Sequence, residues 1–248
     1  MDLRERPGFD GSRHPWETVR AQFFLSLLDR FTALEDRGSW LDIGAGDAWI
    51  GRQLHARLPS GSRVVCWDVN YGTDDLTTSE PATVELTARR PSQHFDGVLL
   101  LDVIEHVADD RQLLDDAVGR LTRPGGWVLA SVPAYPSLFS NHDRFLHHYR
   151  RYRPGRFFGL LGDAGVDIVA HGGLFHSLLG VRAAQVAHER LTRQRAAEDG
   201  VGDWKASTVV TSVVTHLLAA EAGVSLALGS RGWGVPGLSC WALGKRRR

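Results

Sequence analysis

The chain has 248 residues, which is enough for one large domain or two small ones. Its hydrophobic content of 43% and charged content of 23% are ordinary for a globular protein, and its 29 lysines and arginines equal its 29 aspartates and glutamates. This balance excludes a strong overall attraction to nucleic acid or to an anionic membrane. The N-terminal stretch lacks the apolar core of a signal peptide, and the apolar run at residues 208–220 is short for a membrane span. We therefore expect a cytoplasmic protein with no transmembrane segment.

Apolar residues recur at helical spacing over residues 15–34 and predict an N-terminal helix with one buried stripe. Seven apolar runs of strand length follow, at residues 39–43, 64–69, 83–87, 97–101, 127–133, 166–170 and 239–244. Helices are expected over 109–121 and 154–165, so strands and helices alternate along much of the chain. This alternation, with continuously apolar strands, indicates an α/β fold around a mainly parallel sheet that is buried on both faces.

The chain is expected to form a single domain over residues 1–248. No stretch is rich enough in proline, glycine or serine to separate two units. Residues 174–235 have a mostly helical pattern with no repeat, and they precede the last strand as an insertion. The apolar helices of this insertion are candidates for a cap over a substrate or for the surface of a homodimer.

A glycine-rich turn follows the strand at 39–43, where residues 44–46 read Gly-Ala-Gly. In open α/β sheets ligands bind beyond the carboxyl ends of strands, and glycines there let the backbone approach a ligand. No Gly-Lys-Ser or Gly-Lys-Thr follows, which excludes a Walker A phosphate loop, and Trp49 stands where a dinucleotide fingerprint has glycine or alanine. Asp68 ends the next strand, where a carboxylate can accept hydrogen bonds from both hydroxyls of a ribose. These features predict an adenosyl ligand without a diphosphate, a description that S-adenosylmethionine meets.

Four segments resemble, in order and spacing, the motifs of class I S-adenosylmethionine-dependent methyltransferases: WLDIGAGDAW (40–49), CWDVN (66–70), FDGVLLLDVIEHVADD (95–110) and LTRPGGWVLASVP (121–133). Residues 132–155, with RHPWETVR near the N-terminus and LSCWALGKR near the C-terminus, are similar to a bacterial subgroup related to ubiquinone-biosynthesis methyltransferases. The resemblance implies a Rossmann-like seven-stranded sheet in the order 3-2-1-4-5-7-6 with an antiparallel last strand. It also implies that residues 1–37 form a helical lid over the cofactor pocket and that 174–235 form a helical cap.

The resemblance further implies S-adenosyl-L-methionine as methyl donor and S-adenosylhomocysteine as product. The residues expected to contact the cofactor are Arg20, Asp42, Gly44, Ala45, Gly46, Asp68, Val69, Asp102 and Val103. Among them, Asp42 is expected to serve the ammonium group of the donor. Two positions depart from the family pattern: Ala48 replaces a usual third glycine, and the strand end VELTARRP (84–91) lacks the usual acidic or small polar residue near the adenine. The adenine partner is therefore left unassigned.

Methyl transfer from a sulfonium needs a base only where the acceptor must lose a proton, as a hydroxyl does. His106, His142 and His148 are the candidate catalytic residues, because an imidazole titrates near neutral pH. An equal alternative for His106 is a structural residue at a helix start. Asp102, Glu105 and His106 also resemble metal ligands of some relatives, including small-RNA 2′-O-methyltransferases and quinone O-methyltransferases. Because the same motif occurs in many metal-free relatives, we expect no metal.

The segment that follows the strand at 127–133 is rich in histidine, arginine and tyrosine. We expect it to form a substrate wall from His142, Asp143, His147, His148, Tyr149, Arg150, Arg151 and Tyr152. The pair Arg150 and Arg151, beside aromatic rings, can hold a carboxylate or phosphate, or bind RNA through its backbone. The alternative is an arginine-rich loop that salt bridges fold over the sheet edge.

These features favour a methyltransferase that acts on oxygen, nitrogen or carbon of a small molecule, in secondary metabolism or on a lipid- or sugar-linked precursor. An anionic acceptor is expected if the arginine pair binds it, and nucleic acid is not expected as a partner. Two alternatives stay open. One is an RNA or peptide methyltransferase that uses the basic loop at 142–156, and the other is a non-catalytic module that binds the cofactor.

Overall fold

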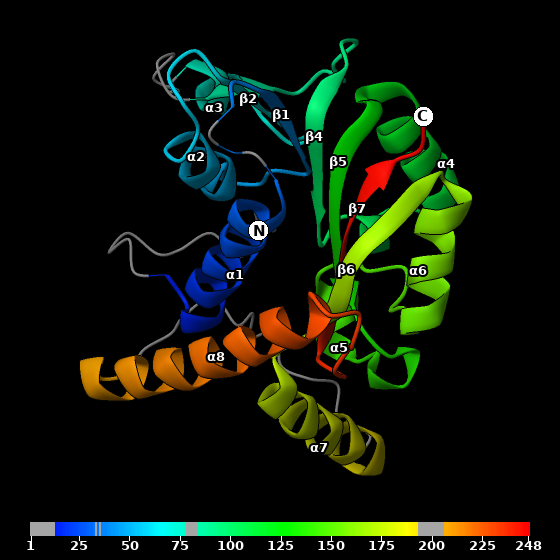
Figure 1. The fold of residues 1–248 in the computed structure, drawn as a ribbon. Coiled ribbons are helices and arrows are strands. Elements are labelled where there is room, and N and C mark those ends of the chain that lie inside the picture. The colour runs from blue at the N-terminus through cyan, green and yellow to red at the C-terminus, as the bar shows by residue number, and fades with distance from the viewer. Residues whose placement is uncertain (1–12, 33, 35, 78–83, 193–205) are drawn as a thin grey trace.

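The structure, a computed structural model, describes the chain apart from residues 1–12, 33, 35, 78–83 and 193–205. Seven strands form one sheet in the order β3-β2-β1-β4-β5-β7-β6 (Figure 1). Their bounds are β1 Ser39–Ile43, β2 Arg63–Trp67, β3 Glu85–Thr87, β4 Phe95–Leu101, β5 Thr122–Pro133, β6 Val166–Leu174 and β7 Ser239–Arg246. Paired strands are parallel, except that β7 is antiparallel to both β5 and β6. The predicted strand order and the antiparallel last strand are confirmed.

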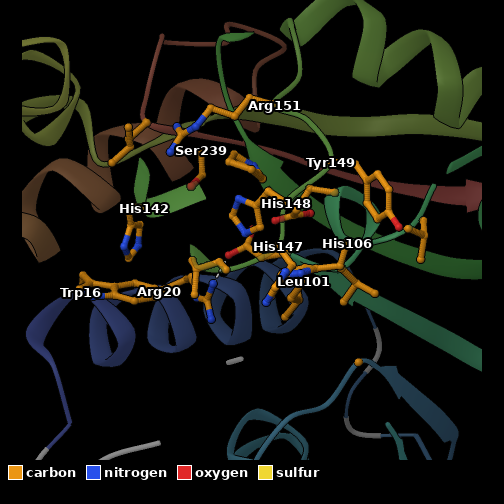
Figure 2. Close-up of a pocket in the computed structure, with 18 of the residues that line it drawn as sticks. Trp16, Arg20, Leu101, His106, His142, His147, His148, Tyr149, Arg151 and Ser239 are labelled. Carbon is orange, nitrogen blue, oxygen red and sulfur yellow. Dashed lines mark hydrogen bonds and ion pairs between the residues drawn. The ribbon is translucent and has the colours of Figure 1, made fainter. Parts of the chain in front are cut away.

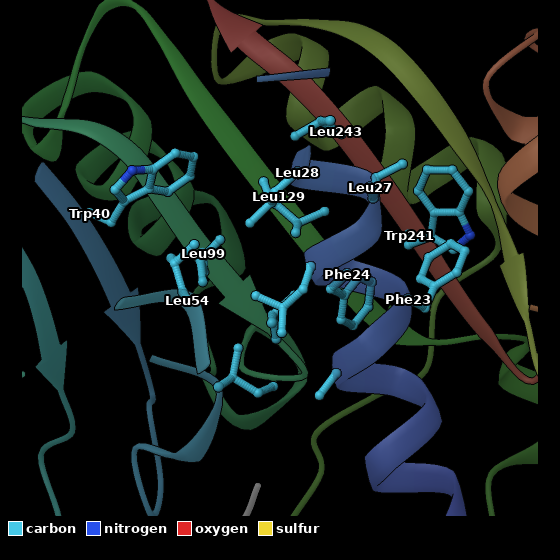
Figure 3. Close-up of a cluster of buried hydrophobic side chains, with 14 of the residues drawn as sticks. Phe23, Phe24, Leu27, Leu28, Trp40, Leu54, Leu99, Leu129, Trp241 and Leu243 are labelled. Carbon is cyan, nitrogen blue, oxygen red and sulfur yellow. The ribbon is translucent and has the colours of Figure 1, made fainter. Parts of the chain in front are cut away.

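Helices cover both faces of the sheet. Their bounds are α1 Pro15–Phe31, α2 Trp49–His55, α3 Thr73–Thr77, α4 Asp110–Asp116, α5 Asn141–Phe145, α6 Pro154–Asp163, α7 His176–Thr192 and α8 Thr208–Gly229. Side chains of β4 alternate between the two faces, since Leu99 belongs to the cluster around α1 whereas Val98 and Leu100 belong to the cluster around α4 and α6. Figure 3 shows the first cluster, in which Phe24 and Leu27 of α1 lie against the sheet. The continuous apolar strands predicted from the sequence are therefore buried on both sides.

Several elements differ from the predicted bounds, among them one helix and one strand. The helix expected over 109–121 is α4 followed by a π-helical turn at Ala117–Leu121. Strand β6 continues to Leu174 through two successive glycines, four residues past the predicted end at Ala170. A side chain at Gly173 would collide with the backbone of Gly237, so these glycines permit close packing within the strand instead of ending it.

The insertion before β7 consists mainly of α7 and α8, and α8 reaches away from the sheet (Figure 1). Helix α8 has 22 residues and includes an 18-residue window of mean hydropathy 1.5, so by length and composition it is sufficient to cross a membrane. The prediction that this run is too short for a span is therefore wrong, because the helix continues nine residues beyond 220 to Gly229. Leu218, Ala222, Ser225 and Gly229 are buried and hold one side of α8 on the domain.

Candidate active site

The turn between β1 and α2 is held in a conformation that favours glycine. Gly44 and Gly46 have φ of 65° and 56°, and the Gly44 amide donates to the Trp67 carbonyl at 2.7 Å. A Cβ at Gly44 would lie 2.6 Å from Cγ2 of Val103, so the turn packs closely against the segment after β4. Ala48, which replaces the usual third glycine, has φ of 59° and caps α2 in a left-handed conformation that costs a non-glycine residue energy.

Asp68 follows β2 and is nearly buried at the wall of a cavity beyond the strand ends. Its Oδ2 accepts the Gly46 amide at 2.9 Å, and its Oδ1 accepts the backbone and side-chain amides of Asn70 at 2.9 and 3.0 Å. These bonds fix the carboxylate and use three of about four acceptor positions, which leaves Oδ2 room for one further donor. The neighbouring Val69 is 74% exposed and also lines the cavity. Asp68 and Val69 therefore lie where the predicted adenosyl contacts require them.

Asp102 lies just beyond the end of β4 and meets the N-terminal helix. Its backbone has φ of 57°, its Oδ1 accepts the Ser131 hydroxyl at 2.8 Å, and its Oδ2 pairs with the Arg20 guanidinium. Arg20 is 4% exposed, and its Nε has no hydrogen-bond partner among the described residues. Its guanidinium lies 4.9 Å from the ring centroid of Trp16, and both α1 side chains line the cavity (Figure 2). Helix α1 thus forms one wall of the cavity.

Three predicted cofactor residues lie behind the turn and are not among the residues that line the cavity: Asp42, Ala45 and Gly46. Asp42 is buried beneath α2, beside Gly51 and Cys66. Burial raises the pKa of Asp42 to about 7, and the nearby carboxylates of Asp68 and Asp47 add to the rise. The direct roles of these three residues toward the cofactor stay predictions.

The three candidate catalytic histidines all line the cavity (Figure 2). The rings of His106 and His148 pack edge to face with centroids 4.6 Å apart. Burial, followed by the charge of Arg182, lowers the pKa of His142 to about 4. Glu105, next to His106, is fully buried, neither of its carboxylate oxygens is hydrogen-bonded within the described part of the chain, and burial raises its pKa well above the ordinary value.

The ligand atoms of Glu105, His106 and His148 lie within 4.8 Å of one another, close enough to hold a metal ion. This group differs from the one that the resemblance suggested, because Asp102 is occupied by Arg20 and Ser131. A protonated Glu105 satisfies the same geometry without an ion, since a neutral carboxyl avoids the cost of a buried charge. The expectation that no metal is used stays a prediction.

His148 is oriented by a buried carboxylate. Its Nδ1 lies 3.0 Å from Oδ1 of Asp143, which also accepts Nε of Arg151 at 2.7 Å. Burial alone would raise the pKa of Asp143, but the hydrogen bonds from His148, Arg151 and the Ser140 amide hold it well below its ordinary value. Because an ionised carboxylate only accepts, the neutral imidazole of His148 carries its proton on Nδ1, and Nε2 then has a free lone pair.

The substrate wall predicted from the loop is corrected in three positions. Arg150 donates to the carbonyls of Val107 and Ala108 and pairs with Asp110 at 2.9 Å, outside the cavity. Tyr152 is buried with its hydroxyl 3.0 Å from Asp110, and Asp143 lies behind the wall. The loop is folded against the sheet edge by these interactions, which is the alternative that the sequence left open.

Arg151 does line the cavity, but its guanidinium is committed to Asp143 and to the Ala134 carbonyl. The two arginines therefore do not form a paired clamp for an anion in the cavity, since Arg150 lies outside it and Arg151 is held by Asp143. His142, His147, His148 and Tyr149 remain at the wall as expected.

The cavity has a volume of about 1220 Å³ and continues under the insertion. Its far wall consists of residues that the sequence did not indicate: Phe175, Leu178, Val181, Arg182 and Gln185. No motif in this block points to a site, so only their position in the fold reveals them. Drug-sized ligands occupy sites of roughly 300–1,000 Å³, and the larger volume here leaves room for a donor and an acceptor together.

The residues present fit an adenosyl sulfonium donor. The close-packed Gly44 turn and the fixed Asp68 carboxylate lie at the carboxyl ends of β1 and β2, where nucleosides bind in such sheets. Arg20 and Asp102, which pair with each other, place a positive and a negative group at the cavity wall. These charges are complementary to the carboxylate and the ammonium of the donor's amino-acid part.

Comparison with known proteins agrees with this geometry. The methyltransferase domain family matches residues 16–169, which is more than half of the chain. A ubiquinone biosynthesis O-methyltransferase of Nitrosospira multiformis is 22% identical over 201 residues, which cover 68% of this chain and 82% of that protein.

Two solved structures share the fold. The N-methyltransferase NodS of Bradyrhizobium japonicum, in complex with S-adenosylhomocysteine, has a TM-score of 0.56 at 13% identity and covers 100% of this chain and 95% of its own. A putative methyltransferase in complex with the Haloferax volcanii activator Trm112 has a TM-score of 0.56 at 16% identity, over 94% of this chain and 91% of its own. With the family match and the donor site together, the chain belongs to the methyltransferase domain family and is a class I S-adenosylmethionine-dependent methyltransferase.

Proposed function

We propose that the protein methylates a hydroxyl group of a small molecule, with His148 as general base. The observation that carries this proposal is the pairing of His148 with buried Asp143 inside the cavity that Gly44, Asp68 and Asp102 also line. The pairing leaves Nε2 of His148 free to accept a proton at a position beside the donor site. An acceptor that loses a proton during transfer, as a hydroxyl does, is the kind that benefits from such a base.

The chemistry is an in-line displacement at the donor's methyl carbon. The acceptor oxygen forms a bond to that carbon, the carbon–sulfur bond breaks, and its electron pair stays on sulfur to give S-adenosylhomocysteine. The hydroxyl proton passes to Nε2 of His148 as the oxygen attacks. The protein contributes alignment and exclusion of water, and the buried carboxylate of Asp143 stabilises the imidazolium that forms.

His148 is preferred to the other two candidate histidines for physical reasons. The low pKa of His142 makes it a poor proton acceptor near pH 7. The ring of His106 packs edge to face against the ring of His148, and we propose that it restricts the motion of that ring and of the acceptor. We further propose that no metal takes part and that the acceptor comes from secondary metabolism or from a lipid- or sugar-linked precursor in the cytoplasm.

A small acceptor is favoured over RNA by the fate of the basic loop. Arg150 and Arg151 are the residues through which RNA binding was considered, and both are committed to partners within the domain. The positive surface required for a phosphate backbone is therefore reduced on this side of the cavity.

The test is release of S-adenosylhomocysteine with a panel of phenols, catechols, alcohols, amines and a short RNA hairpin. We expect turnover with hydroxyl acceptors, and we expect His148→Ala to lower kcat by about 100-fold or more at pH 7 without changing affinity for S-adenosylhomocysteine. His147→Asn is the matched control, because His147 also lines the cavity and asparagine tolerates its φ of 56°. Unchanged kcat in His148→Ala, or turnover of amines or RNA alone, would contradict the proposal.

A further inference from the structure

Helices α7 and α8 carry few charged residues, and each of these is engaged within the protein. Across α7 and α8, both of which the structure describes in full, four residues are Asp, Glu, Lys or Arg. Each has a partner on the body or on the other helix: Arg182 with Asp143, Glu189 with the Asn141 amide, Arg190 with the Ser137 carbonyl, and Glu221 with Ser177. In a chain with 23% charged residues, two helices that carry only four such residues and engage all four within the protein present a largely apolar surface, which suits contact with something other than water.

The outer face of α8 is an apolar stripe. It consists of Val209, Val210, Val213, Leu217 and Val224, which are between 47 and 73% exposed. At about 100° per residue these five positions fall within about 100° of helix circumference, and at 1.5 Å per residue they extend over about 22 Å. The opposite side of α8 is the one that packs on the domain. Helix α7 adds Val181 and Leu191, which are 55 and 84% exposed.

The polar side chains beside the stripe satisfy hydrogen bonds within the helix. The Thr215 hydroxyl donates to the Thr211 carbonyl at 2.7 Å, and Nδ1 of His216 lies 2.7 Å from the Ser212 carbonyl. Such back-bonding is how hydroxyl and imidazole groups are accommodated where water is scarce. These groups consequently offer little to a partner that binds through hydrogen bonds.

The occupant that fits this face is a lipid bilayer. A protein partner, including a second copy of this chain, makes about one hydrogen bond per 100–200 Å² of interface and has a polar rim, whereas this stripe presents methyl groups alone. Hydrocarbon needs no such partners. Because the inner side of α8 is packed on the domain, the helix lies along the membrane surface and does not cross it.

We propose that α7 and α8 dock the enzyme on a bilayer, with the α8 stripe buried at the boundary between headgroups and acyl chains. Val181 of α7 both lines the cavity and is 55% exposed, so the cavity reaches the surface at the insertion that we propose to dock on the membrane. Since the stripe carries no charge, binding depends on apolar burial and extends to neutral lipid.

The test is cosedimentation of the full-length protein with phosphatidylcholine vesicles. The wild type is expected to sediment with the vesicles, with less than a twofold change when NaCl is raised from about 0.1 to about 0.5 M. The double variant Val213→Asp/Leu217→Asp is expected to partition at least about tenfold less, because each carboxylate must lose water to enter the interface. Val169→Asp, at an exposed bulge of the edge strand β6, is the matched control and is expected to sediment as the wild type does.

Calorimetric titration with S-adenosylhomocysteine accompanies each variant and is expected to be unchanged. It separates this proposal from methyl transfer, because α8 lies outside the donor site. The proposal is overturned if the wild type stays in the supernatant, or if the double variant binds vesicles as the wild type does. A dimer in light scattering that the double variant dissociates, without wild-type binding to vesicles, would assign the face to a second copy of the chain.

Discussion

The Gly44 turn provides a quantitative test of the donor site. Alanine at this position keeps φ near 65°, which costs roughly 1–2 kcal/mol for a residue with a Cβ. The new methyl would lie 2.6 Å from Cγ2 and 3.1 Å from Cγ1 of Val103, and overpacking of this kind costs about 1–3 kcal/mol. Loss of freedom in the unfolded chain offsets about 0.4–1 kcal/mol. We therefore expect Gly44→Ala to lower the free energy of unfolding by about 3 kcal/mol.

Two further variants divide that cost into its parts. Gly125→Ala carries the backbone cost alone, because Gly125 has φ of 77° and a Cβ added there would meet no atom of the described residues within 4 Å. Val103→Ala removes the obstructing methyls, so Gly44→Ala in that background is expected to cost about as much as Gly125→Ala. Urea unfolding, followed by tryptophan fluorescence, gives the free energies of unfolding of the wild type and of these four variants.

The same variants test the link between the turn and the cofactor. Gly44→Ala is expected to bind S-adenosylhomocysteine at least about tenfold more weakly in calorimetry, because its methyl occupies the wall of the donor site. The reasoning is refuted if Gly44→Ala is no less stable than Gly125→Ala, or if Val103→Ala gives no relief. Either result would mean that the turn does not pack as closely as the structure shows.

Three more predictions follow from buried or strained groups. Burial, and next the charge of Asp102, raises the pKa of Glu105, so the folded protein keeps this carboxyl protonated while the unfolded chain ionises above about pH 4.5. The contribution of Glu105 to the free energy of unfolding is therefore greatest below that pH and falls as the pH rises toward the folded pKa. Glu105→Gln should remove this contribution's fall and be the more stable form at pH 8, as urea titrations of both proteins between pH 4 and 9 would measure. Ala48→Gly relieves a left-handed φ of 59° and is expected to raise the free energy of unfolding by up to about 1 kcal/mol. Thermal unfolding would show this as a higher Tm, and a lower Tm would contradict the assigned conformation. Dialysis against EDTA should leave the turnover rate within about twofold of that of the untreated enzyme. A loss of turnover that Mg²⁺ or Zn²⁺ restores would instead identify Glu105, His106 and His148 as metal ligands.

The strands of the sheet and the glycine turn after β1 could be predicted from the sequence, because both depend on residues that are adjacent in the chain. Continuous apolar runs indicated seven strands, and the resemblance supplied their order. The Gly-Ala-Gly turn and Asp68 could be placed at strand ends because parallel strands bring their carboxyl ends to one edge. Strand lengths were less predictable, since β6 continues through two glycines that pack against Trp241 and Gly237, both distant in sequence.

The loop after β5 shows where such reasoning fails. Its histidines and Arg151 line the cavity, but a side chain's role depends on which partner it meets. Arg150 meets Asp110, and Arg151 meets Asp143, at separations in sequence that no periodicity reveals. The loop is therefore folded onto the domain by ion pairs, which was the alternative to an anion site, and its buried Asp143 carboxylate orients His148.

On the proposed function, the cavity has a donor half and an acceptor half, and the residues that form each half can be substituted independently. The donor half is built from turns after β1, β2 and β4, where substitution disturbs both packing and the cofactor. The acceptor half is closed by α7, whose Leu178, Val181 and Arg182 come from a segment with no family motif. Arg182 reaches Asp143 at 3.4 Å, so a change in α7 can alter the acceptor wall and the setting of His148 without reaching the Gly44 turn. Acceptor specificity should therefore follow the insertion, and exchange of α7 between related enzymes should change the substrate while leaving affinity for S-adenosylhomocysteine intact.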